Sequence, residues 1–205
     1  MIQNSVEWFE ARAGKITASN FHKLAGVKGL GKGGETYLFE LIANEMGAMN
    51  DEVNAFALQY GTDMEPIARE YLCKALNVEV EEVGFITAKF DKEIGYSADG
   101  IIKEGNRGLE IKCPLVVENH LKYMTIKTAA DLKKIEPKYY WQVIFSMYCS
   151  GLKSWLFVSF NPKFNGADRM HCININADEK EFDFIKERIE EAKKLKEEIK
   201  LKLEL

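Results

Sequence analysis

Two apolar segments joined by a short polar stretch constrain the fold of this chain most, because charged residues stand inside them. Segment 96–102 reads Tyr-Ser-Ala-Asp-Gly-Ile-Ile, and segment 109–114 reads Leu-Glu-Ile-Lys-Cys-Pro. The stretch 104–108 between them, Glu-Gly-Asn-Arg-Gly, predicts that the two segments form a β-hairpin. In such a hairpin Asp99, at the end of the first strand, lies alongside the second strand.

The charges of this hairpin are of the kinds that bind and use a metal ion. Glu110 and Lys112 are two residues apart, so on a strand both side chains leave the same face. The carboxylates of Asp99 and Glu110 suit a hard cation such as Mg2+, which keeps waters that substrate phosphates can displace. Lys112 can then orient or help to deprotonate a metal-bound water. This is the set of groups that phosphodiester hydrolysis requires.

A purely structural interpretation of the same residues stays open at this point. Asp-Gly is a common turn dipeptide, and Glu-x-Lys on an exposed strand is often a solvated ion pair. The apolar neighbours favour a half-buried sheet, where a charge without a partner or a metal is costly. These neighbours are Ile101, Ile102, Leu109, Ile111 and Cys113.

Size and composition favour one globular domain over residues 1–205, with a C-terminal helix over 177–205. The chain has 205 residues, and 46% of them are hydrophobic. The net charge of −4 argues against a protein that only coats DNA, which needs a basic face. It weighs less against a nuclease, whose acidic site a metal neutralises. The four cysteines form no C-x-x-C pair, which argues against a zinc site, an iron–sulfur cluster or a disulfide framework.

The chain carries no sign of export or of membrane insertion. No apolar run approaches the roughly 18 residues of a membrane span, and the N-terminus lacks a basic region followed by an apolar one. We therefore expect a cytoplasmic protein without a membrane partner. His22, His120 and His171 lack metal-ligand spacing, so we expect them at the surface or with satisfied hydrogen bonds.

Apolar periodicity and capping residues predict a mixed α/β chain with a central sheet flanked by helices. Within 55–76 we expect two helices, because Gly61 and Pro66 interrupt the pattern. Further helices are expected over 5–11, from Thr17 or Ser19, over 36–46, irregularly up to Glu136, over 139–149 and over 178–205. Besides the Glu-x-Lys strand, strands are expected around 78–87, 94–102, 154–160 and 170–174.

Glu65 and Gln142 each allow two interpretations. Glu65 lies in Thr62-x-x-Glu65, which is a capping box, and it is also a candidate third carboxylate for the metal site if its helix points there. Gln142 lies among residues of core character, and a buried glutamine needs a partner. That partner is either the site or DNA on one interpretation, or main-chain groups on the other.

Arg12 is a candidate phosphate ligand near a predicted helix start. With the hydroxyls of Thr17 and Ser19 and nearby main-chain N–H groups, its guanidinium could hold a phosphate. An ordinary surface arginine is the alternative.

Five short segments, taken in order, resemble the phage lambda exonuclease family, also called the YqaJ-type viral recombinases. The resemblance extends over residues 5–160, and its departure is Ala98 in place of the proline after which the wider PD-(D/E)xK superfamily is named. The segments are 8–19 (Trp-Phe-Glu-Ala-Arg-Ala-Gly-Lys-Ile-Thr-Ala-Ser), 61–65 (Gly-Thr-Asp-Met-Glu), 97–100 (Ser-Ala-Asp-Gly), 109–114 and 139–142 (Tyr-Tyr-Trp-Gln).

The resemblance implies a restriction-endonuclease-like PD-(D/E)xK fold and a Mg2+-dependent exonuclease. Such an enzyme digests one strand of linear duplex DNA from its 5′ end and leaves a 3′ single-stranded tail. Asp99, Glu110 and the main-chain carbonyl of Ile111 are then the ligands of a first Mg2+, and Glu65 with Asp99 serves a second; Mn2+ is expected to substitute. Lys112 positions the attacking water.

The resemblance also implies a DNA-end pocket and partners. Arg12 and Ser19 match residues that hold the terminal 5′-phosphate, and Gln142 matches a glutamine near the site. The family further suggests a homotrimeric ring, a single-strand annealing partner protein, and a phage or prophage gene expressed in the bacterial cytoplasm.

Two alternatives stay open beside the exonuclease. One is a related DNA endonuclease, and the other is a catalytically silent DNA-binding or assembly module on the same fold. The presence of Asp99, Glu110 and Lys112 together argues against a silent module, and the acidic net charge argues against simple DNA binding.

Overall fold

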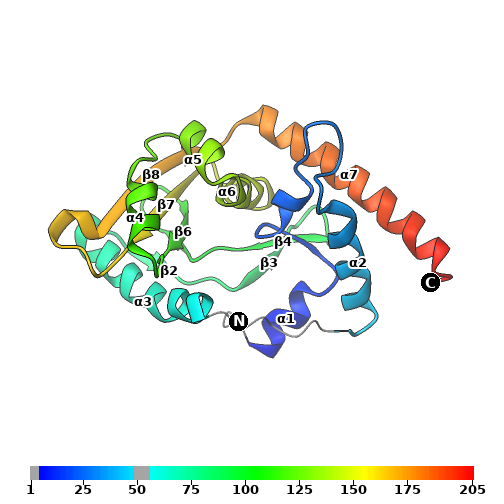
Figure 1. Ribbon diagram of the computed structural model, residues 1–205, viewed down its shortest axis with the longest axis horizontal. Helices are drawn as coiled ribbons and strands as arrows, with labels where there is room; N and C mark the ends of the chain where they lie inside the picture. The colour runs from blue at the N-terminus through cyan, green and yellow to red at the C-terminus, as the bar shows by residue number, and fades with distance from the viewer. Residues whose placement is uncertain (1–4, 49–55) are drawn as a thin grey trace.

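The strands form two sheets, and the chain passes directly from a strand of one sheet into a strand of the other (Figure 1). The computed structural model describes residues 5–48 and 56–205. Within them, a five-stranded sheet has the order β2-β5-β6-β7-β8 and a three-stranded sheet has the order β1-β4-β3. The strands are β1 (Ile16–Thr17), β2 (Val80–Glu81), β3 (Phe85–Thr87), β4 (Ile94–Ser97), β5 (Gly100–Ile102), β6 (Arg107–Lys112), β7 (Ser154–Phe160) and β8 (Met170–Asn176).

The larger sheet is mixed and is built around β6. The predicted hairpin is confirmed, because β5 and β6 pair antiparallel with Gly100 opposite Leu109. On its other edge β6 pairs parallel with β7, and Glu110 lies opposite Phe157. A parallel pair needs a long crossover, and here the chain between β6 and β7 forms three helices.

Two helices cover opposite faces of the larger sheet, α3 on one side and α6 on the other (Figure 1). Leu109 and Ile111 of β6 pack with Ala68 and Leu72 of α3 in one apolar cluster. Since side chains alternate along a strand, Glu110 between them faces α6. The helices are α1 (Val6–Arg12), α2 (Gly34–Glu45), α3 (Phe56–Leu76), α4 (Val117–Met124), α5 (Ala129–Ile135), α6 (Pro137–Ser150) and α7 (Glu179–Lys202), with 3-10 turns at Phe21–Lys23 and Gly166–Arg169.

The α6 helix forms the centre of the main core. Pro137 stands at its first turn, where a missing N–H costs nothing, and Gly151 ends it in the left-handed conformation with φ 73°. Nine of its side chains are buried. A helix that is apolar on every side is stable only when the protein encloses it, as it does here. The predicted helix over 139–149 is therefore confirmed.

The last helix, α7, presents an apolar stripe to the core, as its periodicity predicts. Ile185, Ile189, Ala192 and Ile199 are buried on this stripe. The predicted strands over 154–160 and 170–174 and the helices over 5–11 and 36–46 are also confirmed within a few residues. No helix in the described part of the chain is both long enough and apolar enough to cross a membrane.

The helix predicted to begin at Thr17 or Ser19 is wrong. Ile16 and Thr17 instead form β1, which pairs parallel with Ile94 and Gly95 of β4, and only the short turn Phe21–Lys23 follows. The Ile16 N–H donates to the carbonyl of Glu93 at 2.8 Å. The strand pairing thus supplies the main-chain hydrogen bonds that the predicted helix would have formed within itself.

The division of 55–76 into two helices is also wrong, because α3 runs unbroken through Gly61 and Pro66. Residue 55 lies outside the described residues. Pro66 is on the exposed side of α3, while Ala68 and Leu72 on the other side are fully buried. Burial of that face outweighs the lost hydrogen bond of the proline. Glu65 consequently lies in the middle of a helix, which excludes the capping-box interpretation.

Two predicted strands are each divided between the two sheets. Residues 78–87 contain β2 and β3, and residues 94–102 contain β4 and β5. The second division falls at Ala98 and Asp99. This break places Asp99 at the junction of the sheets.

Candidate active site

Asp99 is anchored by the main chain of β6. Its N–H donates to the carbonyl of Leu109 at 3.0 Å, and its Oδ2 accepts from the Ile111 N–H at 2.6 Å. Both bonds follow from the hairpin, whose pairing with β6 extends to Asp99, the residue just before β5 begins. Asp99 is only 8% exposed, so its carboxylate is fixed beside β6 as the sequence predicts.

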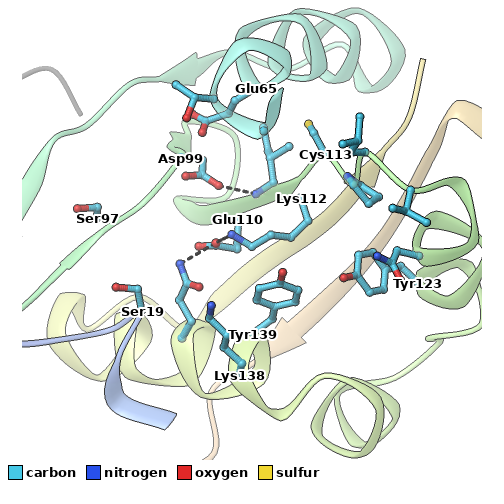
Figure 2. A pocket seen from close by; sticks show the side chains of 18 of the residues that line it. Ser19, Glu65, Ser97, Asp99, Glu110, Lys112, Cys113, Tyr123, Lys138 and Tyr139 are labelled. Atoms are coloured by element: carbon cyan, nitrogen blue, oxygen red, sulfur yellow. Dashed lines mark hydrogen bonds and ion pairs between the residues drawn. The ribbon is translucent and has the colours of Figure 1, made fainter. Parts of the chain in front are cut away.

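Glu110 and Lys112 point together from β6 into a cavity of about 480 Å³ that α6 borders (Figure 2). Lys112 Nζ forms an ion pair with Glu110 Oε1 and lies 4.9 Å from the centre of the Tyr139 ring. Gln142 Nε2 donates to the same Oε1 at 2.7 Å. Gln142 is therefore bonded to a site residue, in line with the first of its two interpretations.

Glu65 reaches the cavity from α3. It forms an ion pair with Arg69, whose Nη2 lies 2.6 Å from Glu65 Oε1. Arg69 Nε also donates to the Asp99 carbonyl at 3.0 Å, and its Nη1 pairs with Glu82 at 2.6 Å. Arg69 thus ties α3 to the junction of the sheets and holds Glu65 on the side of Asp99.

The carboxylates of this cavity lie in an environment that disfavours their charge. Burial, followed by the charge of Asp99, raises the pKa of Glu65 to about 7. Burial raises the pKa of Glu110 to about 8, although Lys112 opposes it. Burial also pulls the pKa of Lys112 down, but Glu110 and Asp99 outweigh it, and this pKa lies above its ordinary value.

The residues present fit a hard divalent cation. Glu110 is fully buried, and its Oε2 has no hydrogen-bond partner among the described residues. An unpartnered buried carboxylate oxygen is costly, and a cation would satisfy it. The described residues contain no cluster of three or more His, Cys, Asp or Glu side chains able to hold a metal by themselves. Mg2+ characteristically takes one or two carboxylates and completes its shell with waters and phosphate oxygens.

A second part of the cavity is built around Arg12, at the end of α1. Its Nη2 donates to Ser19 Oγ at 3.1 Å and its Nη1 donates to Ser97 Oγ at 3.4 Å. The guanidinium lies 3.9 Å over the Trp8 ring, and Trp8 Nε1 also donates to Ser97 Oγ at 3.1 Å. Burial lowers the pKa of Arg12 to about 10. No carboxylate of the described residues pairs with this cation, so it is available to an anion.

Thr17 is not brought into the wall of this cavity. It is 3% exposed, and its N–H donates to the Tyr37 hydroxyl at 3.1 Å. Its Oγ1 lies 3.4 Å from Ser19 Oγ, so it lies behind Ser19. The reason is the strand β1, which turns Thr17 toward α2 instead of toward the site.

Several site residues are missed by reasoning from the sequence. Ser97 and Trp8 lie within segments that carry the family resemblance, but neither spacing nor composition indicates that they hold Arg12. Arg69 has a detectable signal, because it follows Glu65 by four residues, the spacing of a helical ion pair. Lys138, which lines the cavity from α6, has none.

The histidines have satisfied hydrogen bonds, as expected. His120 is fully buried between Ser159 Oγ, 2.7 Å from Nδ1, and the Asp168 carbonyl, 2.8 Å from Nε2. His171 Nε2 contacts the Ile126 carbonyl at 2.6 Å. The four cysteines are free thiols.

Solved structures with the same fold include two exonucleases. The chain is 28% identical to an alkaline exonuclease (LHK-Exo) from Laribacter hongkongensis, with a TM-score of 0.79 over 97% of this chain and 98% of that chain. The same enzyme in complex with dAMP gives a TM-score of 0.78 at 28% identity, with the same coverage. A phage-related exonuclease from Haemophilus somnus 129PT shares the fold at 14% identity, with a TM-score of 0.74 over 92% of this chain and 96% of that chain. No curated protein sequence matches.

The mixed sheet with helices on both faces is the PD-(D/E)xK nuclease fold that the sequence resemblance implies. The model of one protein family, the YqaJ-like viral recombinase domain, matches residues 7–153, which include every candidate site residue. This chain therefore belongs to the YqaJ-like viral recombinase family.

Proposed function

We propose that this protein is a Mg2+-dependent 5′-to-3′ exonuclease of linear duplex DNA, formed by a single domain over residues 1–205. The observation that carries the proposal is that one cavity contains both a carboxylate–lysine cluster and an arginine that pairs with no carboxylate of the described residues. Asp99, Glu110 and Lys112 supply the groups for hydrolysis, and Arg12 with Ser19 supplies a place for a terminal phosphate. The relatives named as exonucleases, one of them in complex with dAMP, support the same reaction and substrate class.

In this proposal Asp99, Glu110 and the Ile111 carbonyl would hold a first cation, and Glu65 with Asp99 would hold a second. Bound divalent cations would activate water and stabilise charge on the attacking and leaving oxygens. Lys112 orients the water, because its ammonium is held at the cavity by Glu110 and packs over Tyr139. Gln142 keeps Glu110 in place through its 2.7 Å bond.

The DNA end is held by its 5′-phosphate. Arg12 is oriented by Ser19, Ser97 and Trp8, so its guanidinium is preorganised for an anion. Water attacks the phosphorus of the next phosphodiester and the 3′ oxygen of the terminal nucleotide leaves. The shortened strand then carries a new 5′-phosphate, which can occupy the same place, and the other strand becomes a 3′ tail.

The biological setting follows from the family. A 3′ tail is the substrate of a single-strand annealing protein, so we propose such a protein as partner, in a phage or prophage recombination system of the bacterial cytoplasm. A homotrimeric ring is proposed on the same ground. Sedimentation of the purified protein measures the oligomer, and a monomer at working concentrations would contradict the ring.

The test uses linear duplexes with 5′-phosphate or 5′-hydroxyl ends and a covalently closed circle, each with Mg2+, with Mn2+ and with EDTA. Labels placed separately on the 5′ and 3′ ends report the direction. We expect rapid loss of the 5′ label from phosphorylated ends in either metal and none in EDTA. Loss from the 3′ end contradicts the direction, and cutting of the circle identifies an endonuclease. No cleavage of any substrate identifies a silent binding module.

A further inference from the structure

Lys138 is a basic residue of the cavity that neither the sequence motifs nor the proposed reaction uses. It is the second residue of α6, one helical turn before Gln142, so the two side chains share a face of the helix. Figure 2 shows Lys138 reaching from α6 into the pocket, between Ser19 and Tyr139 in that view. All four of these residues line the same cavity.

The charge of Lys138 is not committed to any carboxylate of the described residues. Lys112, the other lysine of the cavity wall, is paired with Glu110. Glu136, two residues before Lys138, is bound instead to Lys122 at 2.7 Å. Lys138 is solvent-exposed at the mouth of the cavity, and partial desolvation, followed by the positive charge of Lys112, lowers its pKa.

Lys138 and Arg12 line the same cavity, and the helix that carries Lys138 packs against the turn that follows Ser19. Burial, and next the charge of Lys138, lower the pKa of His22. The Nδ1 atom of His22 lies 3.1 Å from the carbonyl of Ser19, and α6 packs against the turn that contains His22. Ser19 in turn accepts from Arg12 at 3.1 Å. Lys138 and Arg12 therefore line the same cavity as Ser19, and neither cation forms an ion pair with a carboxylate of the described residues.

Two cations suit a terminal phosphate better than an internal one. A phosphomonoester carries about −1.5 to −2 charges near neutral pH, whereas each phosphodiester of the DNA backbone carries one. Arg12 alone leaves part of the monoester charge without a partner. A lysine is an effective phosphate ligand as a point charge, while arginine supplies the planar fork.

We propose that Lys138 is the second cation of the 5′-phosphate pocket and so determines the preference for phosphorylated over hydroxyl 5′ ends. This inference rests on the proposed exonuclease function. Lys138 contacts the terminal phosphate from α6, in addition to Arg12 from the end of α1, and its charge contributes little when the end carries only a hydroxyl group.

The test is the release of the first nucleotide from duplexes with a 5′-phosphate or a 5′-hydroxyl end, by the unmodified protein, K138M and K138R. Only the first nucleotide is informative, because each cut creates a new 5′-phosphate. For K138M on phosphorylated ends we expect about a tenfold higher half-saturating DNA concentration and a nearly unchanged maximum rate, as for the loss of one charge-assisted contact. On hydroxyl ends the half-saturating DNA concentration should change by less than about twofold. On phosphorylated ends K138R should recover most of the affinity that K138M loses.

The matched control is K134M, since Lys134 is an exposed lysine on α5 that does not line the cavity. It should behave like the unmodified protein on both ends. Equal losses by K138M on the two ends, or no loss on either, would overturn the inference.

A binding measurement separates this inference from the proposed function. Calorimetric titration with dAMP and with deoxyadenosine needs no cleavage. We expect K138M to bind dAMP about tenfold more weakly than the unmodified protein does. The difference in affinity between dAMP and deoxyadenosine should shrink by the same factor. If the unmodified protein cleaves no duplex, the proposed function fails. If dAMP binds K138M and the unmodified protein equally, the inference about Lys138 fails whatever the cleavage assay shows.

Discussion

Replacing Gln142 by Met tests whether this residue acts on Glu110, the proposed metal ligand, or on DNA. Gln142 Nε2 donates to Glu110 Oε1 at 2.7 Å inside the protein, and Met has a similar length without the donor. The other oxygen of Glu110, Oε2, has no partner among the described residues. In Gln142→Met the Glu110 carboxylate would keep only its ion pair with Lys112.

The expected loss of Mg2+ affinity follows from the kind of hydrogen bond that is removed. A hydrogen bond to a charged group contributes about 1.5 to 3 kcal/mol, which corresponds to roughly ten- to a hundredfold in an equilibrium constant. Loss of a group that orients a metal ligand weakens metal binding by about the same factor. We therefore expect the Mg2+ concentration for half-maximal cleavage to rise roughly ten- to a hundredfold, and the rate at saturating Mg2+ to recover in large part.

The same bond also stabilises the metal-free protein. Its loss should lower the melting temperature without metal by roughly 3 to 12 °C, at about 2 to 4 °C per kcal/mol for a chain of this size. The assay is a Mg2+ titration of first-nucleotide release, together with thermal unfolding with and without Mg2+. Ser146→Ala is the matched control, because Ser146 is buried on the same helix and donates only to the Gln142 carbonyl at 2.8 Å.

One result would refute this reasoning. If Gln142→Met leaves the half-activating Mg2+ concentration unchanged and instead raises the DNA concentration for half-saturation, Gln142 acts on DNA. The bond to Glu110 would then have no part in metal binding.

Four further substitutions test the site and the fold. Lys112→Ala should abolish cleavage while fluorescence anisotropy still detects DNA binding, and a near-normal rate would exclude its proposed role. Gly108→Ala should destabilise the protein to urea by about 1 to 3 kcal/mol, because a Cβ at Gly108 would lie 2.1 Å from Cε3 of the buried Trp155 ring; an unchanged urea midpoint would show that the ring moves freely. Glu45→Ala should cost about 3 kcal/mol or more, since it strips the buried Lys196 of its main carboxylate. Lys196→Met should lower the free energy of unfolding by less than Glu45→Ala does. Equal losses in the two variants would contradict a penalty for an unpaired buried charge.

The carboxylate–lysine cluster could be predicted because its geometry is local. Asp99, Glu110 and Lys112 lie on one hairpin, whose turn and alternation are visible in the sequence. Register then fixes which side chains share a face. The final helix and the apolar strands could be predicted for the same reason, since their periodicity is intrinsic to each element.

The phosphate side of the cavity could not be derived from local pattern. Arg12 and Ser97 are 85 residues apart, and they meet because β1 pairs parallel with β4. That pairing replaced a predicted helix at Thr17, since two residues of strand carry no recognisable period. The family resemblance suggested Arg12 and Ser19, but not the hydrogen bond by which Ser97 holds Arg12 in place.

Glu65 shows the same limit from the opposite direction. Its role depended on whether α3 is continuous, and Gly61 and Pro66 are strong local signals for a break. The buried contact between α3 and β6, which overrides these signals, lies between segments about forty residues apart. Only the assembled fold decides between a helix cap and a cavity residue.

The break between β4 and β5 connects the two halves of the cavity and sets the size of the expected product. Ser97 ends β4 beside Arg12, and Asp99 begins the segment that binds β6, so the proposed phosphate pocket and the proposed cleavage cluster are two residues apart along the chain. The Cα atoms of Ser97 and Asp99 are therefore at most about 7 Å apart. Under the proposed function, a terminal phosphate held at Arg12 would bring a phosphodiester close to the chain end to Asp99, and a distant one would lie beyond the cluster. Mass analysis of the first products should show mononucleotides, and a dominant dinucleotide would contradict this spacing.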